Sequence, residues 1–453
     1  MASFDLLPDE LLVKIFSYLG IHDLTCSVRN VCSWWRRVSE DDAIWLNLRY
    51  CPTGLTPLSE INFLLENTPT LRQFHYTGSL NFVRKLCECC RKVSVLHIPH
   101  TTVTASDLRL AVHCLTELRD LGVYIAQEEM AVLLTVIISN CKTLVSLTLY
   151  SPMGVTAVNG LLLPIADGCP NLTVLKCKAL DSTTGDFCYF LHRKKDKLVT
   201  YEYHGAVTTG ILMAIDECTN LKSVSFFGHG INGIFTGVPP LTKLQNLKTL
   251  EISGYTFPTA NTMVLMLFHN ILSQLSYICL SYIGGNIDTI TNEITLKCPL
   301  LTHLNLEGNE LHCEGLRNIH SCKMLKYLDV SSCVRVERRG MTYVADGCPQ
   351  LQHLDFSRNP VSERIFRQIL RFKNLKTLLM MNCYLTDINL RLISTHINGL
   401  LYLLIGPEYE LAYSLRNQLK REMPQLLIQE TSFLYNGNEY VRMKRDPLPK
   451  YLS

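Results

Sequence analysis

A pattern of the form Leu-x-x-Leu-x-Leu recurs along most of this 453-residue chain and constrains its fold more than any other feature. Fourteen positions occupy the first apolar place of the pattern, and successive positions are 22 to 28 residues apart. They are Leu71, Val93, Leu118, Leu144, Leu172, Leu198, Leu221, Leu247, Leu275, Leu301, Leu325, Leu351, Leu375 and Leu400. A period of about 25 residues indicates an array of stacked repeats and not a single compact core.

Each copy predicts one strand and one helix. The Leu-x-Leu pair alternates with period two, as a half-buried strand does. The stretch after it has helical spacing in several copies, for example at Met341, Val344 and Ala345. One strand and one helix cannot bury their apolar faces alone, but stacked copies can. We therefore predict an α/β chain that forms a right-handed solenoid of about 14 repeats, with a parallel sheet on its concave face.

Two further positions recur within the repeats. Cys298, Cys322 and Cys348 stand three residues before the first Leu of their copies. The third residue after the last apolar position is Asn309, Cys333, Asn359 or Cys383, and we expect these side chains to bond the turning backbone of the next coil. With its Cys-Pro-x-Leu copies, the region of roughly residues 67–428 resembles the cysteine-containing subfamily of leucine-rich repeats. The copies at Leu71 and Leu198 are degraded, because aromatic residues replace the later leucines.

The first 48 residues follow a helical period instead. Apolar residues recur at Leu7, Leu11, Leu12, Ile15, Phe16 and Leu19. Pro8 suits a first turn, and Asp23 is placed to cap a second helix that runs through Leu24 to Trp35. A third apolar group contains Ile44 and Trp45. So short a segment carries more large apolar side chains than its own core can cover, which indicates a surface for a partner.

The residues of this segment closely resemble an F-box. The resemblance rests on Leu7-Pro-Asp-Glu-Leu-Leu12, Ile15-Phe-Ser-Tyr-Leu19, Asp23-Leu24, Val31-Cys32, Trp35-Arg36 and Trp45. It implies three helices that dock the Skp-type adaptor of a cullin-RING ubiquitin ligase. By matching position, the docking candidates are Leu7, Pro8, Leu11, Ile15, Phe16, Leu19, Val31, Cys32, Trp35 and Trp45. Some of these will be internal core, and the sequence does not separate the two groups. The alternative is a three-helix cap that only shields the first repeat.

These features divide the chain into four predicted parts. Residues 1–48 form the F-box, 49–66 a linker helix or adaptor segment, 67–428 the repeat solenoid and 429–453 a C-terminal tail. The tail is polar after about Tyr435, and both disorder and a return into the concavity stay open.

The late repeats offer a candidate substrate surface. Residues that flank each Leu-x-Leu point away from the core and line the inner sheet face. Tyrosines and carboxylates gather there, which suits a basic or hydrogen-bonding peptide. The candidate substrate-binding residues are Tyr277, His303, Glu307, Tyr327, Asp329, His353 and Asp355, and Asn305 lies on the same face.

Signals for enzyme chemistry are weak. Gly228-His-Gly-Ile-Asn-Gly233 follows a predicted strand, Ser223 to Phe227, but Pro239 and Pro240 follow it where a dinucleotide site needs a helix. Cys87, Cys89 and Cys90 lie near His97 and His100, but their spacing is not that of an ordinary zinc site. We therefore expect no catalytic residues, no metal and no cofactor.

Composition narrows the environment and the partners. The net charge of +3 is too small to favour nucleic acid or an anionic membrane. The odd number of cysteines, 19, and their spacing favour reduced thiols. The first ten residues have no positive, apolar leader, and no apolar run is long enough to span a membrane. We expect a cytoplasmic or nuclear protein.

Taken together, the resemblance to F-box/leucine-rich-repeat proteins implies a non-catalytic, substrate-recognising subunit of an SCF-type ubiquitin ligase. Its implied partners are the Skp-type adaptor, the cullin and RING subunits bound through that adaptor, and a protein substrate. Two alternatives share this architecture: a scaffold that delivers nothing for ubiquitination, and a receptor whose concave pocket binds a small molecule near Lys176 and Lys178.

Overall fold

The computed structural model describes residues 7–46, 48–124, 142–150, 162–178, 184–228, 241–255, 272–406 and 413–430. The chain forms two compact units, Met1–His204 (unit 1) and Gly205–Ser453 (unit 2). The tail beyond residue 430, for which the sequence leaves two arrangements open, lies outside the described residues.

Parallel strands run through both units in chain order. Unit 1 contains β1 (Arg49–Tyr50), β2 (Gln73–His75), β3 (Val95–Thr102), β4 (Asp120–Tyr124), β5 (Ser146–Tyr150), β6 (Val174–Lys178) and β7 (Thr200–His204). Unit 2 contains β8 (Ser223–Phe227), β9 (Thr249–Ser253), β10 (Tyr277–Ser281), β11 (His303–Asn305), β12 (Tyr327–Asp329), β13 (His353–Asp355), β14 (Thr377–Met380), β15 (Tyr402–Ile405) and β16 (Leu427–Glu430).

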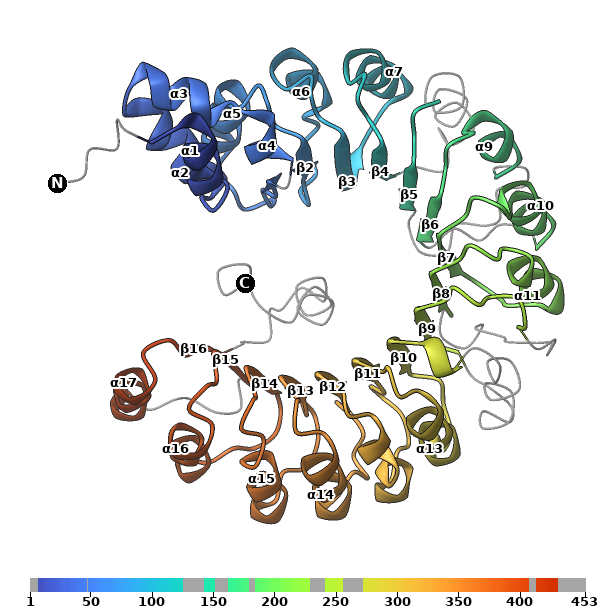
Figure 1. Ribbon diagram of the computed structural model, residues 1–453, viewed down its shortest axis with the longest axis vertical. Helices are drawn as coiled ribbons and strands as arrows, with labels where there is room; N and C mark the ends of the chain where they lie inside the picture. Colours follow the sequence, from blue (N-terminus) through green and yellow to red (C-terminus); the bar gives the residue numbers. More distant parts are fainter. Residues whose placement is uncertain are drawn as a thin grey trace. The chain divides into compact units, whose positions relative to one another are not determined.

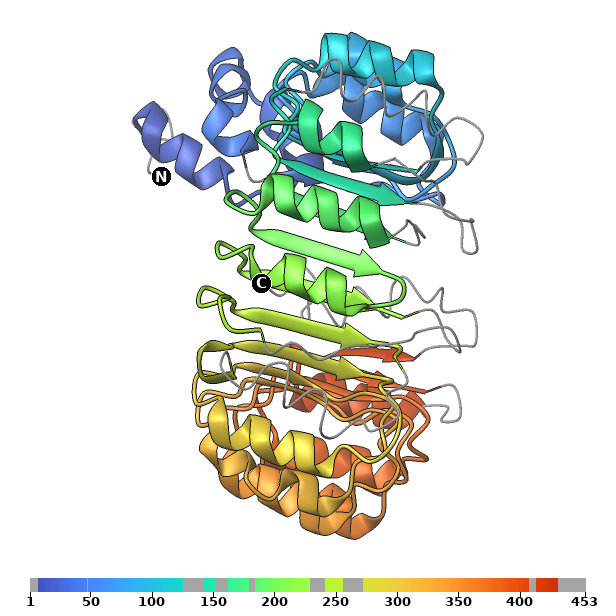
Figure 2. The same cartoon turned by 90° about the vertical axis from the view of Figure 1, so that its right-hand side faces the viewer.

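Helices follow most strands and cover one side of each sheet. After the N-terminal helices, the described α-helices are α5 (Leu58–Asn67), α6 (Val83–Cys89), α7 (Ala105–Cys114), α9 (Leu162–Gly168), α10 (Thr184–Lys194), α11 (Thr209–Asp216), α13 (Asp288–Lys297), α14 (Arg338–Gly347), α15 (Glu363–Ile369), α16 (Asp387–His396) and α17 (Tyr413–Glu422). In unit 2 the strands line the inner side of an arc and the helices lie outside it (Figure 1). The strands of this unit also point to a common edge (Figure 2). The predicted α/β solenoid is confirmed within each unit.

The repeat pattern fixes the strand register. Each of the fourteen first apolar positions lies two residues before the start of a strand, from Leu71 before β2 to Leu400 before β15. These side chains are buried, with at most 3% of their surface exposed. The degraded copies keep the same packing, because Phe74, Tyr76, Tyr201 and Tyr203 are also buried. An aromatic ring therefore replaces leucine without breaking the stack.

The recurring Asn and Cys side chains bond the preceding coil, which corrects the expectation that they bond the next one. The Asn309 amide donates to the carbonyl of Leu280 at 2.6 Å, and the Cys333 thiol donates to the carbonyl of Leu306 at 3.1 Å. Asn359 and Cys383 repeat this contact with Val330 and Phe356 of the coils before them. The turn after each strand places this side chain next to the end of the strand in the preceding coil, so its hydrogen bond is made to that coil.

A left-handed residue ends the strand in most coils of unit 2. It stands seven residues after the first apolar position, at Gly205, Gly254, Tyr282, Gly308, Ser332, Arg358 and Asn382, all with φ between 53° and 131°. Gly228 of the glycine-rich motif occupies the same position, and a side chain there would collide with the backbone of Gly254. Gly228 is therefore a turn residue, and the rest of that motif, residues 229–240, lies outside the described part of the chain.

The segment between the predicted F-box and the solenoid contains regular structure. Strand β1 pairs with β2 in parallel, and all but the last residue of α5 falls within residues 49–66. The predicted limits of the four parts stay predictions. The last described strand, β16, ends at Glu430.

Candidate functional site

The N-terminal domain folds as short helices around a small core. They are α1 (Asp9–Phe16), α2 (Ile21–Cys26), the 3-10 turn η2 (Val28–Asn30), α3 (Ser33–Ser39) and α4 (Asp42–Trp45). Leu12, Leu24 and Ile44 are at most 1% exposed. Pro8, expected in a first helical turn, is the N-cap residue directly before α1, and the acidic Asp9 and Glu10 occupy that turn.

The second predicted helix is wrong in its extent. The chain breaks after Cys26, makes the turn η2, and begins α3 only at Ser33. Cys32 is the cause, because its backbone is extended and its sulfur accepts a hydrogen bond from the Trp35 amide at 3.4 Å. Helix α2 begins at Ile21, so Asp23 lies in its first turn and does not cap it.

The structure separates the ten docking candidates into surface and core. Phe16 and Trp45 were predicted as docking candidates, but they belong to the core, because each is only 1% exposed. The indole of Trp45 donates to the carbonyl of Ser39 at 2.7 Å, and the ring of Phe16 meets that of Trp35 edge to face at 5.1 Å. These contacts hold the helices together and leave neither Phe16 nor Trp45 available to a partner.

The other candidates form the accessible set. Leu11, Ile15 and Val31 are 47%, 42% and 57% exposed, although each is a large apolar side chain. Pro8 and Cys32 are exposed as well, and Leu7, Leu19 and Trp35 are half-buried. Exposed apolar side chains gathered in one small domain mark an interaction surface. We name these eight residues the apolar docking set.

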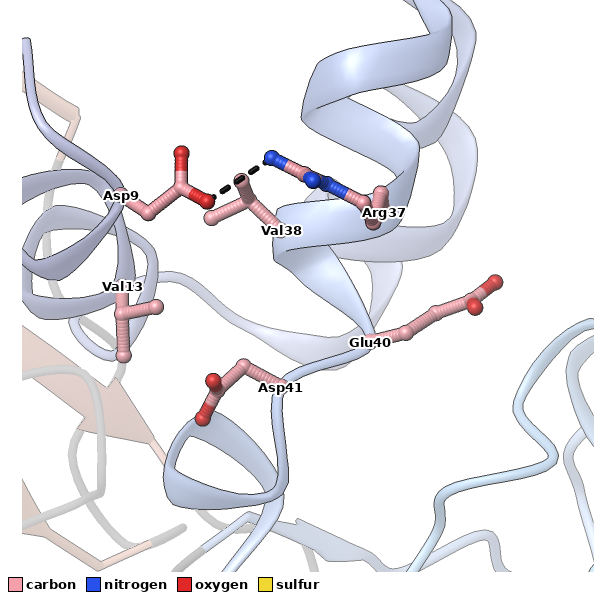
Figure 3. A pocket seen from close by; sticks show the side chains of 6 residues that line it. All are labelled: Asp9, Val13, Arg37, Val38, Glu40 and Asp41. Atoms are coloured by element: carbon pink, nitrogen blue, oxygen red, sulfur yellow. Dashed lines mark hydrogen bonds and ion pairs between the residues drawn. The ribbon is translucent and has the colours of Figure 1, made fainter.

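A polar brace connects the first and third helices of the domain. The two carboxylate oxygens of Asp9 accept hydrogen bonds from the Trp34 indole at 2.7 Å and from the Arg37 guanidinium at 2.8 Å. The brace borders a pocket of about 270 Å³ (Figure 3). Its lining residues are Asp9, Val13, Arg37, Val38, Glu40 and Asp41. Trp34 and Arg37 thus position α3 against α1.

Charged contacts attach this domain to the first coils of unit 1. Arg29 pairs with Glu40 at 2.9 Å and also donates to the carbonyl of Asn67 at the end of α5. Asp42 pairs with Lys92 at 2.9 Å and with Arg72 at 3.1 Å. The hydrogen bond from Lys92, and the charge of Arg72 beside it, hold the pKa of Asp42 below its usual value. The domain is therefore fixed to the start of the solenoid.

In unit 2, a ladder of rings runs across the inner sheet face. Tyr277, His303, Tyr327 and His353 are direct neighbours in the register of β10 to β13. Successive ring centroids are 5.7, 5.7 and 6.2 Å apart. The sequence placed these four residues on one face, and the structure brings them together as one stack.

The carboxylates predicted on the same face stabilise turns. Asp329 accepts hydrogen bonds from the amide and the hydroxyl of Ser331, and Asp355 accepts one from the amide of Ser357. Asn305 does the same for the amide of Glu307. Side-chain bonds to the backbone two residues later are a common turn device. Asp329 and Asp355 are at most 1% exposed, so burial limits their access to a substrate, as it does at the 8% exposed Glu307.

Burial holds the ladder histidines neutral. It lowers the pKa of His303, with a further contribution from the Lys326 charge. Burial also lowers the pKa of His353 to about 4, and the nearby His303 adds to this effect. At neutral pH the ladder therefore presents aromatic rings and hydrogen-bonding nitrogen atoms without positive charge.

The cysteines near His97 and His100 make packing contacts. Cys90 donates to the carbonyl of Leu65 at 3.3 Å, one coil earlier, and burial raises its pKa to about 12. Within the described residues, no group of three or more His, Cys, Asp or Glu side chains is arranged to hold a metal ion. In the same part of the chain, no helix is long and apolar enough to span a membrane. Lys176, near which the sequence analysis leaves a small-molecule site open, lies opposite Glu202 in the register of β6 and β7.

Comparisons with known proteins match the two regions separately. Residues 4–50 match the F-box-like family, and residues 297–319 match a leucine-rich repeat family. Among solved structures, an internalin from Listeria monocytogenes is 14% identical, with 96% of this chain and 100% of that chain covered and a TM-score of 0.32. Yeast Rad7, solved in complex with Elc1, is 13% identical, with 95% and 94% covered and a TM-score of 0.49. The chain therefore has an F-box-like domain at its N-terminus followed by leucine-rich repeats, the architecture of an F-box/leucine-rich-repeat protein.

Proposed function

We propose that this chain is the substrate-recognising subunit of an SCF-type ubiquitin ligase. The F-box-like domain followed by leucine-rich repeats supports a substrate-receptor role. The observation that carries the proposal is the exposure of Leu11, Ile15 and Val31 on a domain whose own core is already filled. A Skp-type adaptor that covers the apolar docking set removes this surface from water.

The substrate is assigned to the inner face of β10 to β13. The ring ladder provides flat apolar area that loses little conformational entropy on binding. We propose Tyr277 and His303, the more accessible rings of the ladder, as the main contacts, because Tyr327 and His353 are only 5% and 8% exposed and the carboxylates beside them are engaged in turns.

The mechanism is proximity and requires no chemistry from this chain. The adaptor connects the F-box-like domain to cullin and RING subunits, and the solenoid holds the target nearby. Substrate lysines then meet a ubiquitin-charged conjugating enzyme at a raised effective concentration. The cytosol and the nucleus are the proposed locations, because the system in which the chain would act operates there.

Affinity capture from cells tests this function. The intact chain should retain the adaptor, the cullin and substrates, whereas a version without residues 1–48 should lose the adaptor and the cullin but keep substrates. The captured intact assembly, supplied with ubiquitin, its activating and conjugating enzymes and ATP, should modify a co-purified partner. Failure to modify any partner would favour a scaffold, and loss of substrates with residues 1–48 would contradict the assignment to the inner face.

A further inference from the structure

Two cysteine thiols meet beside a surface pocket on the helical side of unit 1. Cys87 lies in α6 and Cys114 is the last residue of α7, and these two helices pack against each other (Figure 1). The two thiols share a hydrogen bond. Other buried thiols, such as those of Cys90 and Cys322, donate instead to main-chain carbonyls. Cys87 of the cysteine-rich motif is therefore one half of a pair, and we name Cys87 and Cys114 the dithiol.

The pocket gives solvent access to the dithiol. It has a volume of about 520 Å³, and both cysteines line it, as do Arg84, Glu88 and Arg91. Cys114 is half-buried, whereas Cys87 is only 3% exposed. A molecule that enters the pocket therefore reaches the sulfur of Cys114 more easily than that of Cys87.

The charged side chains of the pocket favour an anion. Arg84 and Arg91 contribute two guanidinium groups, and Glu88 offsets only one of these charges. The Nε of Arg91 donates to the carbonyl of Cys87 at 3.2 Å, which holds this arginine beside the dithiol. Both arginines are exposed, so an anion in solvent can approach them.

The two thiols differ in reactivity because they differ in burial. Burial raises the pKa of Cys87 to about 12, the neighbouring Cys114 thiol adds to this effect, and the charge of Arg91 opposes it. The thiolate is the reactive form of cysteine, so Cys87 reacts slowly with a molecule from solvent. Cys114 is therefore the thiol that reacts first. Once Cys114 is bonded to another sulfur atom, its contribution to the raised pKa of Cys87 ends, whereas that of Arg91 remains.

We propose that the dithiol undergoes thiol–disulfide exchange with a small anionic disulfide of the glutathione type. In the first step, the Cys114 thiolate attacks one sulfur of glutathione disulfide, releases one glutathione thiolate and keeps the other glutathione as a mixed disulfide. In the second step, the Cys87 thiolate attacks the sulfur of Cys114 and releases the second glutathione. The dithiol loses two electrons and two protons, and the two glutathione molecules gain them. The product is a disulfide between Cys87 and Cys114.

The pocket suits this reactant in size and in charge. Its volume of about 520 Å³ lies within the range of about 300–1,000 Å³ that is typical of small-molecule sites. Glutathione carries more carboxylate than ammonium groups, and guanidinium groups bind carboxylates through paired hydrogen bonds. Arg84 and Arg91 are therefore placed to hold the glutathione carboxylates while Cys114 reacts.

The resulting disulfide joins two adjacent coils of the solenoid. The sulfur atoms are already in contact, so a bond of about 2 Å requires movement only of the two side chains and the adjoining helix ends. Disulfides in a reducing compartment are usually transient and respond to the redox state. The cross-link between α6 and α7 is therefore reversible, and it forms when the glutathione pool becomes oxidised.

Mass spectrometry of the full chain tests the proposal. The reduced chain is incubated with glutathione disulfide, its remaining thiols are alkylated in denaturant, and its peptides are mapped. The main product of the wild type should be the Cys87–Cys114 disulfide. Cys87→Ala should stop the reaction after the first step, so that most molecules carry glutathione on Cys114. Absence of the Cys87–Cys114 disulfide from the wild type would overturn the proposal, as would modification of the partly exposed Cys89 ahead of Cys114.

Matched variants test the role of the pocket. Arg84→Gln with Arg91→Gln should slow the loss of the Cys114 thiol in glutathione disulfide about tenfold, because charged clefts raise encounter rates by at least that factor. The reaction with hydroxyethyl disulfide, which is neutral, should slow much less. Arg109→Gln with Arg119→Gln, at exposed positions outside the pocket, should react as the wild type does. Thermal unfolding checks the folding of each variant, and equal slowing with both disulfides would contradict selection of an anion.

This inference does not depend on the proposed function. Adaptor docking uses the helices α1 to α4, whereas the dithiol lies in α6 and α7. If the disulfide forms in a chain that does not bind the adaptor, the dithiol stands and the ligase role fails. If the adaptor binds and the disulfide does not form, the reverse holds.

Discussion

The side-chain amide of Asn309 donates a hydrogen bond to the carbonyl of Leu280, 2.6 Å away in the preceding coil. It also donates to the carbonyl of Leu306, and its oxygen accepts from the amide of Ile283 at 3.0 Å. Asn309 is 5% exposed, so water cannot replace these bonds. One side chain therefore joins two coils of the solenoid.

Replacement of Asn309 by alanine should lower the free energy of unfolding by about 3 kcal/mol, because several buried polar groups lose their partner. Cysteine should restore part of this loss, since Cys333 and Cys383 make the equivalent contact in other coils. Urea denaturation measures both values. Asn374→Ala, at an exposed amide that donates to the carbonyl of Pro349, is the control and should cost much less. Equal losses for Asn309 and Asn374 would remove the assigned role.

The left-handed turn positions predict a stabilising substitution. Ser332 has φ of 57°, a region that costs a side chain about 1 kcal/mol and glycine almost nothing. Ser332→Gly should therefore raise the free energy of unfolding by about 0.5 kcal/mol, after the greater entropy of glycine in the unfolded chain is included. The shift of the urea midpoint measures it. Gly308→Ser, at the equivalent turn and against the ring of Tyr282, should lower the midpoint instead.

The neutral histidine in the ring ladder predicts a pH dependence. Burial lowers the pKa of His353 to about 4, below its unfolded value near 6.5. The unfolded chain then binds the proton more readily than the folded chain does. The contribution of neutral His353 to the free energy of unfolding is therefore complete above pH 6.5 and is lost as the pH falls toward 4. Between pH 7 and pH 5 this loss is about 2 kcal/mol. His353→Gln should flatten the difference in unfolding free energy between these pH values, and an unchanged slope would contradict the assignment.

The repeat spacing predicted the fold well because strand register and burial are local consequences of the same leucines. Every first apolar position from Leu71 to Leu400 stands at the same distance before its strand. The recurrent left-handed position was missed, although glycines at Gly254 and Gly308 align once the copies are superposed. Non-glycine residues such as Tyr282 obscure that signal, since nothing in their identity demands positive φ.

The candidate site was harder to predict because helical spacing alone does not distinguish core from surface. Phe16 and Ile15 are adjacent in sequence, yet one is buried and the other is 42% exposed. The packing of α3 and α4 against α1 decides this, and sequence spacing does not contain it. Likewise, Asp329 on the inner face accepts bonds from Ser331, a local turn that an Asp-x-Ser sequence could have suggested.

Direct titration of the purified full chain with a purified Skp-type adaptor tests the central claim, that the exposed apolar residues of α1 form a docking surface. Leu11→Asp with Ile15→Asp should weaken binding by about thirtyfold or more, because exposed apolar anchors dominate such interfaces. Leu296→Asp with Leu300→Asp, at similarly exposed positions in unit 2, is the matched control and should bind as the wild type does. Equal affinity of all three proteins for the adaptor, or no binding by the wild-type chain, would contradict the account.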